Sequence, residues 1–347
     1  MSNVLFMAST PLHSLWALGI AAGSFPDARC ALVLIDQRDG DRDWIAETLA
    51  DRMSTPFVEM RRFSEIGKTP WRKLTHARAR MREVTAFTRQ FAPDYVAVGN
   101  DRRAEFFAAL AAAPQAMGAY LDDGTASYNQ SPVPSTSQSP VIRRVVRGFR
   151  SWIYGVPTEQ EPYLGTSQAV QEAWVAWPEQ VHAGLRSKRL HAIRPEWFQL
   201  PQVQTVCAEA CRRAGLDHGA LEGVQLLLAM PHDSLVRRQP GIRVQLQALV
   251  DRTLGQGGRV AIKRHPRSQV MPLTLPDTGV IEVPQRLPLE ILAPLLSGTE
   301  VVGMLTSALI YFRCLNAGVR VASLVPDGYS ESPILNIYRS LGVRLLS

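Results

Sequence analysis

The sequence lacks any long hydrophobic run. No stretch of about 18 uninterrupted apolar residues occurs among its 347 residues, so we expect no transmembrane helix. Residues 1–8 are apolar, but no basic segment precedes them and Pro11 comes soon after them, which is not the pattern of a signal peptide. These absences predict a cytoplasmic protein.

Cysteine is also scarce. The chain has Cys30, Cys207, Cys211 and Cys314, scattered along its length. Cys207 and Cys211 are spaced i, i+4 in a helical pattern, yet no second pair follows at the spacing of a zinc site. We therefore expect reduced, mostly buried cysteines rather than a disulfide framework or a structural metal site.

Acidic residues are outnumbered by basic ones. The chain has 31 Asp and Glu against 38 Lys and Arg, which gives a formal net charge of +7. This charge favours an anionic partner such as a phosphorylated metabolite, an acidic glycan, nucleic acid or an anionic membrane, although a basic surface without a special partner fits equally. We expect no nucleic-acid partner, because the nearest basic and aromatic stretch, 143–152, is a single helix.

The sequence does contain a repeated alternation of short apolar strands and helical patterns. In the first half we expect strands at 3–8, 31–35, 56–60, 95–99 and 118–121, with helices at 11–22, 43–53, 71–91 and 104–112. In the second half we expect strands at 225–230, 259–263, 279–283, 300–304 and 320–324, with helices at 241–254, 289–296, 307–317 and 336–341. Such alternation predicts mostly parallel sheets flanked by helices.

The two halves predict an α/β fold of two Rossmann-like domains facing a central cleft. Ligands of such sheets sit at the carboxyl ends of the strands. We place one domain at 1–160, a second at 161–330, and a C-terminal helix within 331–347 that packs back on the first domain.

A loop and a basic helix lie between the two alternating sets. Residues 125–140 are rich in Ser, Pro, Thr and Gln, which predicts a loop. Residues 141–154 form a basic amphipathic pattern. This helix either docks on an anionic membrane or a glycolipid, at the inner face of the cell membrane, or is a domain-edge helix with a solvated arginine face.

Carboxylates follow an expected strand in the first half. Asp122 and Asp123 come directly after strand 118–121 and precede Gly124. A carboxylate there can take a proton from an acceptor hydroxyl as a general base, or the motif is an Asp-Gly turn with a helix cap. Asn100 and Asp101 follow another strand and are candidates for the acceptor side.

Donor groups follow successive strands in the second half. Lys263, Arg264 and His265 can hydrogen-bond a phosphate, and Pro266 stiffens the turn. Thr306 and Ser307 open a helix, where hydroxyls and free N–H groups form an anion site or an ordinary cap. Glu290 starts another helix and can accept hydrogen bonds from ribose hydroxyls, or favour the helix by its charge alone. His232 follows strand 225–230 as a further candidate donor contact.

One motif points to metal-dependent transfer instead. Asp39-Gly40-Asp41 has the Asp-x-Asp form of metal-dependent sugar transferases. We interpret it as a solvated turn that leads into a helix cap, because no further ligands at a defined spacing are evident.

In this order, Asp-Asp-Gly at 122–124, Lys-x-His-Pro at 263–266, Pro-x-Glu at 288–290 and Thr-Ser at 306–307 resemble the motifs of the bacterial sialyltransferases. The nearest are the polysialyltransferase and lipooligosaccharide sialyltransferase families. Residues 8–13 also resemble their first strand and loop, with His13 in place of a Gln. The resemblance covers separate anchor points from residue 4 to about 324, and the segments between them, especially 125–220, show no match.

The resemblance implies a GT-B fold, a CMP-activated sialic acid or related nonulosonic acid as donor, and a glycan or glycolipid acceptor, as in capsule or lipopolysaccharide synthesis. It implies inversion, no required cofactor or metal, an acceptor-side domain at 1–160 and a donor domain at 161–330. Asp123, rather than Asp122, is then the favoured base, and His265 contacts the donor phosphate and acts as general acid. The implied donor contacts are Lys263, Pro266, Glu290, Thr306, Ser307, Thr10 and His13.

Other functions stay open. A GT-B transferase with another nucleotide sugar, such as a UDP-sugar, would use the same fold. A non-catalytic GT-B-like binding protein is the third interpretation, and the carboxylates together with His265 favour an enzyme over it.

Overall fold

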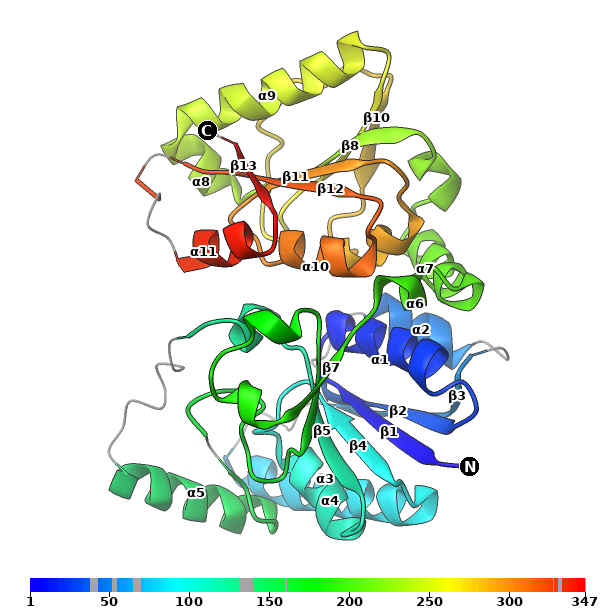
Figure 1. Cartoon of the computed structure of the whole chain (residues 1–347), viewed down its shortest axis with the longest axis vertical. Coiled ribbons are helices and arrows are strands. Elements are labelled where there is room, and N and C mark those ends of the chain that lie inside the picture. Colours follow the sequence, from blue (N-terminus) through cyan, green and yellow to red (C-terminus); the bar gives the residue numbers. More distant parts are fainter. Residues whose placement is uncertain are drawn as a thin grey trace. The chain divides into compact units, whose positions relative to one another are not determined.

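The computed structural model describes residues 1–37, 43–51, 55–64, 70–130, 140–159, 161–326, 328–329 and 333–346. The chain divides into two compact units, Met1–Ile193 and Arg194–Ser347 (Figure 1). This division falls later than the boundary expected after residue 160, because two strands, β6 (Glu172–Val175) and β7 (Arg189–Ala192), extend the first sheet. No helix in the described ranges is long and apolar enough to cross a membrane.

In the described part of the first unit, seven parallel strands form one sheet in the order β3-β2-β1-β4-β5-β6-β7. The strands besides β6 and β7 are β1 (Asn3–Ala8), β2 (Arg29–Gln37), β3 (Phe57–Ser64), β4 (Tyr95–Val98) and β5 (Met117–Leu121). β1 lies inside the sheet and reads as a continuous apolar run, because helices cover both of its faces.

Helices cover the two faces of this sheet in separate groups. They are α1 (Pro11–Ser24), α2 (Trp44–Ala50), α3 (Pro70–Phe91), α4 (Ala104–Ala112) and α5 (Pro140–Tyr154), with the short 3₁₀ helix η1 (Gly124–Ser127). α1 and α2 lie on one face, and α3, α4 and α5 lie on the other (Figure 1). Thr10 caps α1 by accepting a hydrogen bond from the His13 N–H, at 3.3 Å.

The described part of the second unit repeats the design with six parallel strands, in the order β10-β9-β8-β11-β12-β13. The strands are β8 (Val224–Ala229), β9 (Arg259–Lys263), β10 (Val280–Val283), β11 (Glu300–Met304), β12 (Arg320–Leu324) and β13 (Arg344–Leu346). The core packs apolar side chains of the central strands, such as Leu228 and Val302, against Leu246 of helix α9 (Pro240–Gly255).

One helix of the second unit is less regular than the sequence pattern predicts. The α-helices of this unit are α6 (Pro195–Phe198), α7 (Pro201–Arg213), α8 (Asp233–Arg238), α9 (Pro240–Gly255), α10 (Ala308–Leu315) and α11 (Pro333–Ser340). The helix expected at 289–296 is a 3₁₀ helix, η6 (Leu289–Leu295), with Pro294 inside it. The C-terminal segment expected at 331–347 holds α11 and then β13, which pairs with β12 in this unit's own sheet.

The two sheets share one topology. Numbered from the first strand of each unit, the second sheet has the order 3-2-1-4-5-6, and the first has the same order with β7 added at its edge. The order reverses between β1 and β4 in the first unit and between β8 and β11 in the second. In parallel sheets of this kind the crevice beside the reversal point, at the carboxyl ends of the strands, is the usual ligand site. The predicted α/β fold of two Rossmann-like domains is therefore confirmed.

Candidate functional site

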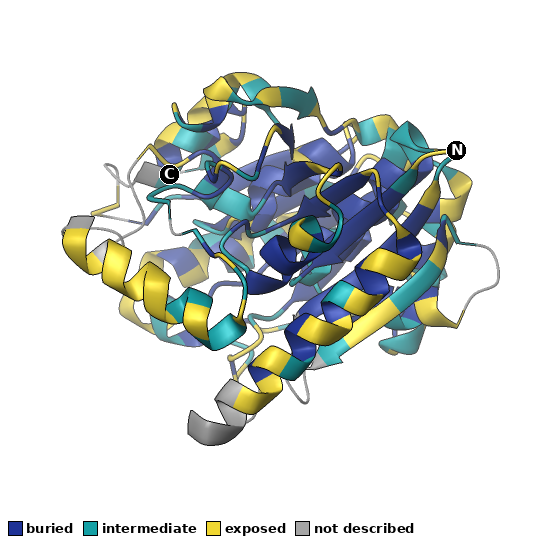
Figure 2. Ribbon diagram, turned by 90° about the horizontal axis from the view of Figure 1, so that it is seen from below, coloured by how far each residue is buried: buried dark blue, intermediate teal, exposed yellow. Residues whose placement is uncertain are grey.

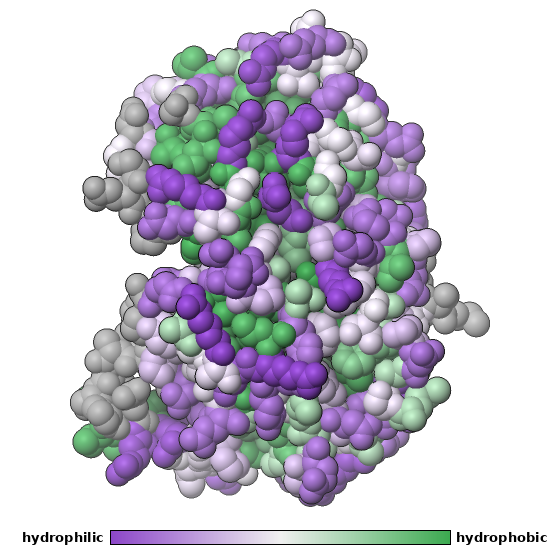
Figure 3. Space-filling model, in the orientation of Figure 1, coloured by the Kyte–Doolittle hydropathy of each residue, from purple (hydrophilic) through white to green (hydrophobic). Residues whose placement is uncertain are grey.

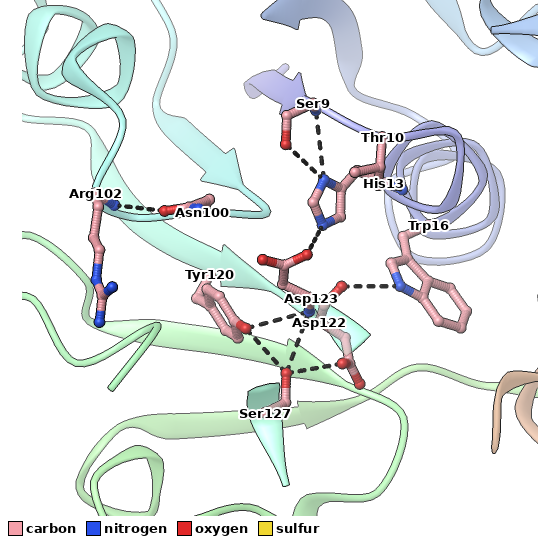
Figure 4. Close-up of polar contacts among 10 residues, drawn as sticks. All are labelled: Ser9, Thr10, His13, Trp16, Asn100, Arg102, Tyr120, Asp122, Asp123 and Ser127. Atoms are coloured by element: carbon pink, nitrogen blue, oxygen red, sulfur yellow. Dashed lines mark hydrogen bonds and ion pairs between the residues drawn. The ribbon is translucent and has the colours of Figure 1, made fainter. Parts of the chain in front are cut away.

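A histidine and a carboxylate meet at the reversal point of the first sheet. His13 lies in the first turn of α1, after β1, and Asp123 follows β5. Their Nε2 and Oδ1 atoms are 3.1 Å apart, which is close enough for an ion pair when the ring is protonated (Figure 4). The angle at Nε2 is not that of a hydrogen bond. The imidazole is buried, whereas 27% of the Asp123 side chain is exposed. Asp123 is thus the member of the pair that a ligand can reach.

Ser9 determines which nitrogen of His13 carries the proton. The Ser9 N–H donates to Nδ1 at 3.4 Å, and the Ser9 Oγ lies 3.1 Å from the same nitrogen. A backbone N–H can only donate, so Nδ1 is an acceptor and the proton of the neutral ring sits on Nε2. That N–H faces the carboxylate of Asp123 (Figure 4).

Two glycines make room for this pair. A Cβ on Gly99, at the end of β4, would lie 2.2 Å from the imidazole of His13, so the ring occupies the space that any side chain would need. Gly124 has a φ of +77°, which lets the chain turn directly after Asp123.

Asp122 has a different environment from its neighbour. Its side chain is fully buried, and it accepts hydrogen bonds from the Ser127 hydroxyl at 2.8 Å, the Ala176 N–H at 2.9 Å and the Tyr128 hydroxyl. Burial raises the pKa of this carboxyl to about 6. Its backbone oxygen accepts a hydrogen bond from the Trp16 indole at 3.1 Å. Asp122 therefore holds the strand end in place, while Asp123 points to the surface.

Tyr120 and Ser127 fix the backbone of Asp123. The Asp123 N–H lies 3.2 Å from both hydroxyl oxygens, and these are 3.0 Å from each other. Burial and the two nearby carboxylates raise the pKa of Tyr120, so it stays neutral. Sequence reasoning missed Ser9, Gly99, Tyr120 and Ser127, because a single residue in a strand or loop carries no pattern.

The acceptor-side candidates Asn100 and Asp101 make local contacts in the structure. Asn100 accepts from the Arg102 N–H at 3.1 Å (Figure 4), and buried Asp101 accepts from the Ser167 N–H at 3.0 Å. Burial raises the pKa of Asp101. The Asp39-Gly40-Asp41 motif lies outside the described residues. Among those described, no group of three or more His, Cys, Asp or Glu side chains could hold a metal ion.

The second unit has a cavity of about 600 Å³ at the carboxyl ends of β8, β9 and β11. It brings together most of the second-half residues singled out in the sequence. Those lining it are His232, Lys263, Arg264, His265, Pro266, Glu290, Thr306 and Ser307, joined by Arg286, which sequence reasoning missed. Basic and N–H-donating groups outnumber the one carboxylate, so the cavity suits an anionic ligand.

Lys263 and Glu290 affect each other's pKa in this cavity. Burial lowers the pKa of Lys263 to about 8, against the opposing effect of Glu290. Desolvation raises the pKa of Glu290, and the charge of Lys263 opposes that rise. The Lys263 ammonium donates to the backbone oxygens of Arg264, at 3.2 Å, and Gln285, which holds it under the turn after β9.

Two histidines line the same cavity. The rings of His232 and His265 are 5.2 Å apart, edge to face. The Nδ1 of His265 accepts the Arg267 N–H at 3.2 Å, so the proton of its neutral ring sits on Nε2. The Nδ1 of His232 lies 3.2 Å from the Ser234 N and 3.1 Å from a carboxylate oxygen of Asp233. Burial, then the charges around it, lowers the pKa of His265, so without ligand it is a neutral donor at pH 7 rather than a charged acid.

The turn before α10 is held in an unusual conformation. Leu305 has a φ of +50°, which is uncommon for a residue with a side chain. The Leu305 N–H donates to the Ser323 hydroxyl at 3.2 Å, and the Tyr338 hydroxyl donates to the Thr306 oxygen at 2.7 Å. Strained turns of this kind cluster at ligand sites, and this one places Thr306 and Ser307 before the helix N-terminus.

Comparison with known proteins supports the fold. No family model and no curated protein matches the chain. Its fold is similar to that of a UDP-GlcNAc 2-epimerase from Methanocaldococcus jannaschii, with a TM-score of 0.50 and 10% identity, over 100% of this chain and 89% of that one. It also matches MurG of Acinetobacter baumannii (TM-score 0.44, 11% identity, 100% and 86% covered) and the glycosyltransferase VinC in complex with dTDP (0.45, 12%, 99% and 86%).

These comparisons overturn the predicted family. The assignment to the bacterial sialyltransferases, and with it the CMP-sialic acid donor, was wrong, because no family model matches the chain and the solved structure to which its fold is similar is a UDP-GlcNAc 2-epimerase. The short motifs were misleading because Asp-Gly turns, basic strand ends and hydroxyl caps suit any Rossmann-like nucleotide site. The two units together have the GT-B fold.

Proposed function

We propose that this chain is a GT-B enzyme that uses a nucleotide sugar, and that it transfers the sugar from a UDP-activated donor to an acceptor hydroxyl. The observation that carries the proposal is the cavity of the second unit. It combines N–H donors, cationic side chains and a helix N-terminus with one carboxylate, which is the set of groups that a nucleoside diphosphate requires.

Each part of the donor has a matching group in this cavity. The Nε2–H of His265, the imidazole of His232 and the N-terminal turn of α10 suit the diphosphate. Glu290 suits the ribose hydroxyls, which donate hydrogen bonds to a carboxylate. UDP is the nucleotide to test first, since the similar epimerase acts on UDP-GlcNAc.

The first unit supplies the base of the proposed reaction. The acceptor oxygen forms a bond to the anomeric carbon, the bond from that carbon to the β-phosphate oxygen breaks, and the hydroxyl proton passes to the Asp123 carboxylate. UDP leaves with the electron pair, and the donors of the second unit stabilise its charge. The His13 N–H, 3.1 Å from Asp123, orients the carboxylate.

Calorimetric titration tests the donor site. UDP, CMP, dTDP, GDP and ADP are titrated into the full chain, and we expect UDP to bind most tightly. Tighter binding of CMP or GDP would refute the choice of UDP, and no binding by any nucleotide would refute the enzyme proposal. His265→Ala should weaken UDP binding. His218→Ala is its matched control, because His218 is an exposed histidine of the same unit outside this cavity.

Turnover then identifies the reaction. Labelled UDP-sugars are incubated with and without hydroxyl acceptors, and we expect UDP release that depends on an acceptor. Isomerisation of the sugar without an acceptor would show an epimerase instead. We also propose that no metal is required, because Lys263, Arg264 and Arg286 already supply positive charge. Activity should persist in excess EDTA, and a loss restored by Mg²⁺ or Mn²⁺ would refute this.

A further inference from the structure

Helix α5 exposes its apolar face. The exposed fractions are 71% for Val141, 66% for Val145, 61% for Phe149 and 57% for Trp152. These four residues are spaced i, i+4, i+8 and i+11, so they lie along one side of the helix. Ile142 and Val146, next to them, are also exposed. Figure 2 shows the described residues of α5 in yellow up to residue 149, with teal ones near its end, whereas α3 beside it alternates between buried and exposed residues.

The other side of α5 is cationic. Arg144 and Arg147 are exposed, and the helix has no acidic residue. Green apolar atoms and purple charged atoms lie next to one another at the start of this helix, at the lower left of Figure 3. An exposed apolar face flanked by arginines is typical of a helix that lies in the interface of a bilayer.

An arginine groove continues this surface. A cavity of about 680 Å³ lies between α3 and the end of α5. Arg78, Arg82 and Arg89 line it together with Tyr154, and none of its described lining residues is acidic. The Arg78 guanidinium lies 5.4 Å from the centre of the Trp152 ring and donates to the Trp152 oxygen at 3.0 Å, which joins the groove to the apolar face.

We propose that α5 and this arginine groove form a docking surface for an anionic lipid bilayer. The apolar face of α5 enters the acyl boundary, and the groove binds the phosphate of an anionic headgroup. Charge complementarity selects this occupant: the surface combines large apolar side chains with arginines, as lipids with anionic headgroups require. The proposal goes beyond the proposed function and does not depend on which nucleotide the second unit binds.

Vesicle sedimentation tests the docking surface. The full chain is mixed with phosphatidylglycerol–phosphatidylcholine vesicles and with pure phosphatidylcholine vesicles. We expect binding to the anionic vesicles that weakens with salt, and at least tenfold weaker binding to the neutral ones. Phe149→Glu and Val145→Glu should each reduce binding about tenfold or more, and Arg82→Gln and Arg89→Gln about fivefold each.

Matched variants make the test specific. Val244→Glu changes a valine that is equally exposed, at 68%, but lies on α9 of the second unit, and it should bind vesicles like the wild type. Equal binding to both vesicle types, or unchanged binding by Phe149→Glu, would overturn the proposal. Sedimentation velocity without lipid is the second measurement, and a dimer that Phe149→Glu dissociates would assign the face to a second copy of the chain instead.

Discussion

The two units have the same strand order but opposite chemistry at the same edge of the sheet. At the reversal point of the first sheet, a partly exposed carboxylate, Asp123, faces the N–H of His13. At the reversal point of the second sheet, cationic and N–H-donating side chains line a cavity. Glu290 is the one carboxylate among its described lining residues. The topology therefore sets where a ligand binds, and the turns after the strands set what the site can do.

The largest expected effect comes from removing the carboxylate of the first unit. Asp123→Asn keeps the shape of the side chain but removes the base, so kcat should fall about 10²–10⁴-fold while the Kd for UDP stays within about twofold. Turnover and calorimetry measure the two quantities. Asp122→Asn is the control, because its loss should be mainly in stability, about 1–3 kcal/mol, from the donors left without an acceptor.

A smaller loss should follow from displacing His13. Gly99→Ala puts a methyl group where the imidazole lies, so we expect kcat to fall about 10²-fold, with a small effect on UDP binding. Gly148→Ala in α5 is the control, since a methyl group at that position would have nothing within 4 Å and the change should stabilise the helix by about 0.5–1 kcal/mol. Equal kcat values for the two variants would remove His13 from the account.

Substitutions in the cavity of the second unit should change the Kd for UDP. His265→Ala removes an N–H donor to the diphosphate and should raise the Kd for UDP about tenfold, with the Tm of the free protein little changed. Calorimetry measures the Kd, and His218→Ala should bind UDP like the wild type. A change in kcat without a change in Kd would contradict the division of roles between the units.

The smallest effect is a pH dependence of UDP binding. The pKa of Lys263 is lowered to about 8, so its positive charge is present below that pH and is lost above it. A bound phosphate favours the charged form, so the Kd should rise about threefold in all between pH 7 and pH 9. Lys263→Arg keeps its charge and should flatten the profile between about pH 7 and pH 9. A flat wild-type profile would exclude Lys263 from donor binding.

Much of the fold could be predicted from the sequence, because a strand buried on both faces is a continuous apolar run. Asn3–Ala8, Arg259–Lys263 and Glu300–Met304 are strands over the predicted bounds. β7 and β13 were not predicted, because edge strands of four and three residues contain no long apolar run. β6 was not predicted because it lies in a segment without a strand–helix alternation. The unpredicted β6 and β7 move the division of the chain to Ile193.

The sites were predictable only in part. Residues that directly follow strands, such as His265 and Thr306, could be placed at the ligand edge from the sequence. The pairing of His13 with Asp123 could not, because 110 residues separate them and only the sheet brings β1 and β5 to the same edge. The donor could not be predicted either, since phosphate-binding turns look alike whichever nucleotide they bind.

The proposed function depends on nucleotide binding in the cavity of the second unit. Photolabelling with azido-UDP, followed by peptide mapping, tests it most directly. We expect labels on the peptides that contain His232, His265, Arg286 and Thr306, with protection by excess UDP. Labels confined to the first unit, or spread over the chain without protection by UDP, would contradict it.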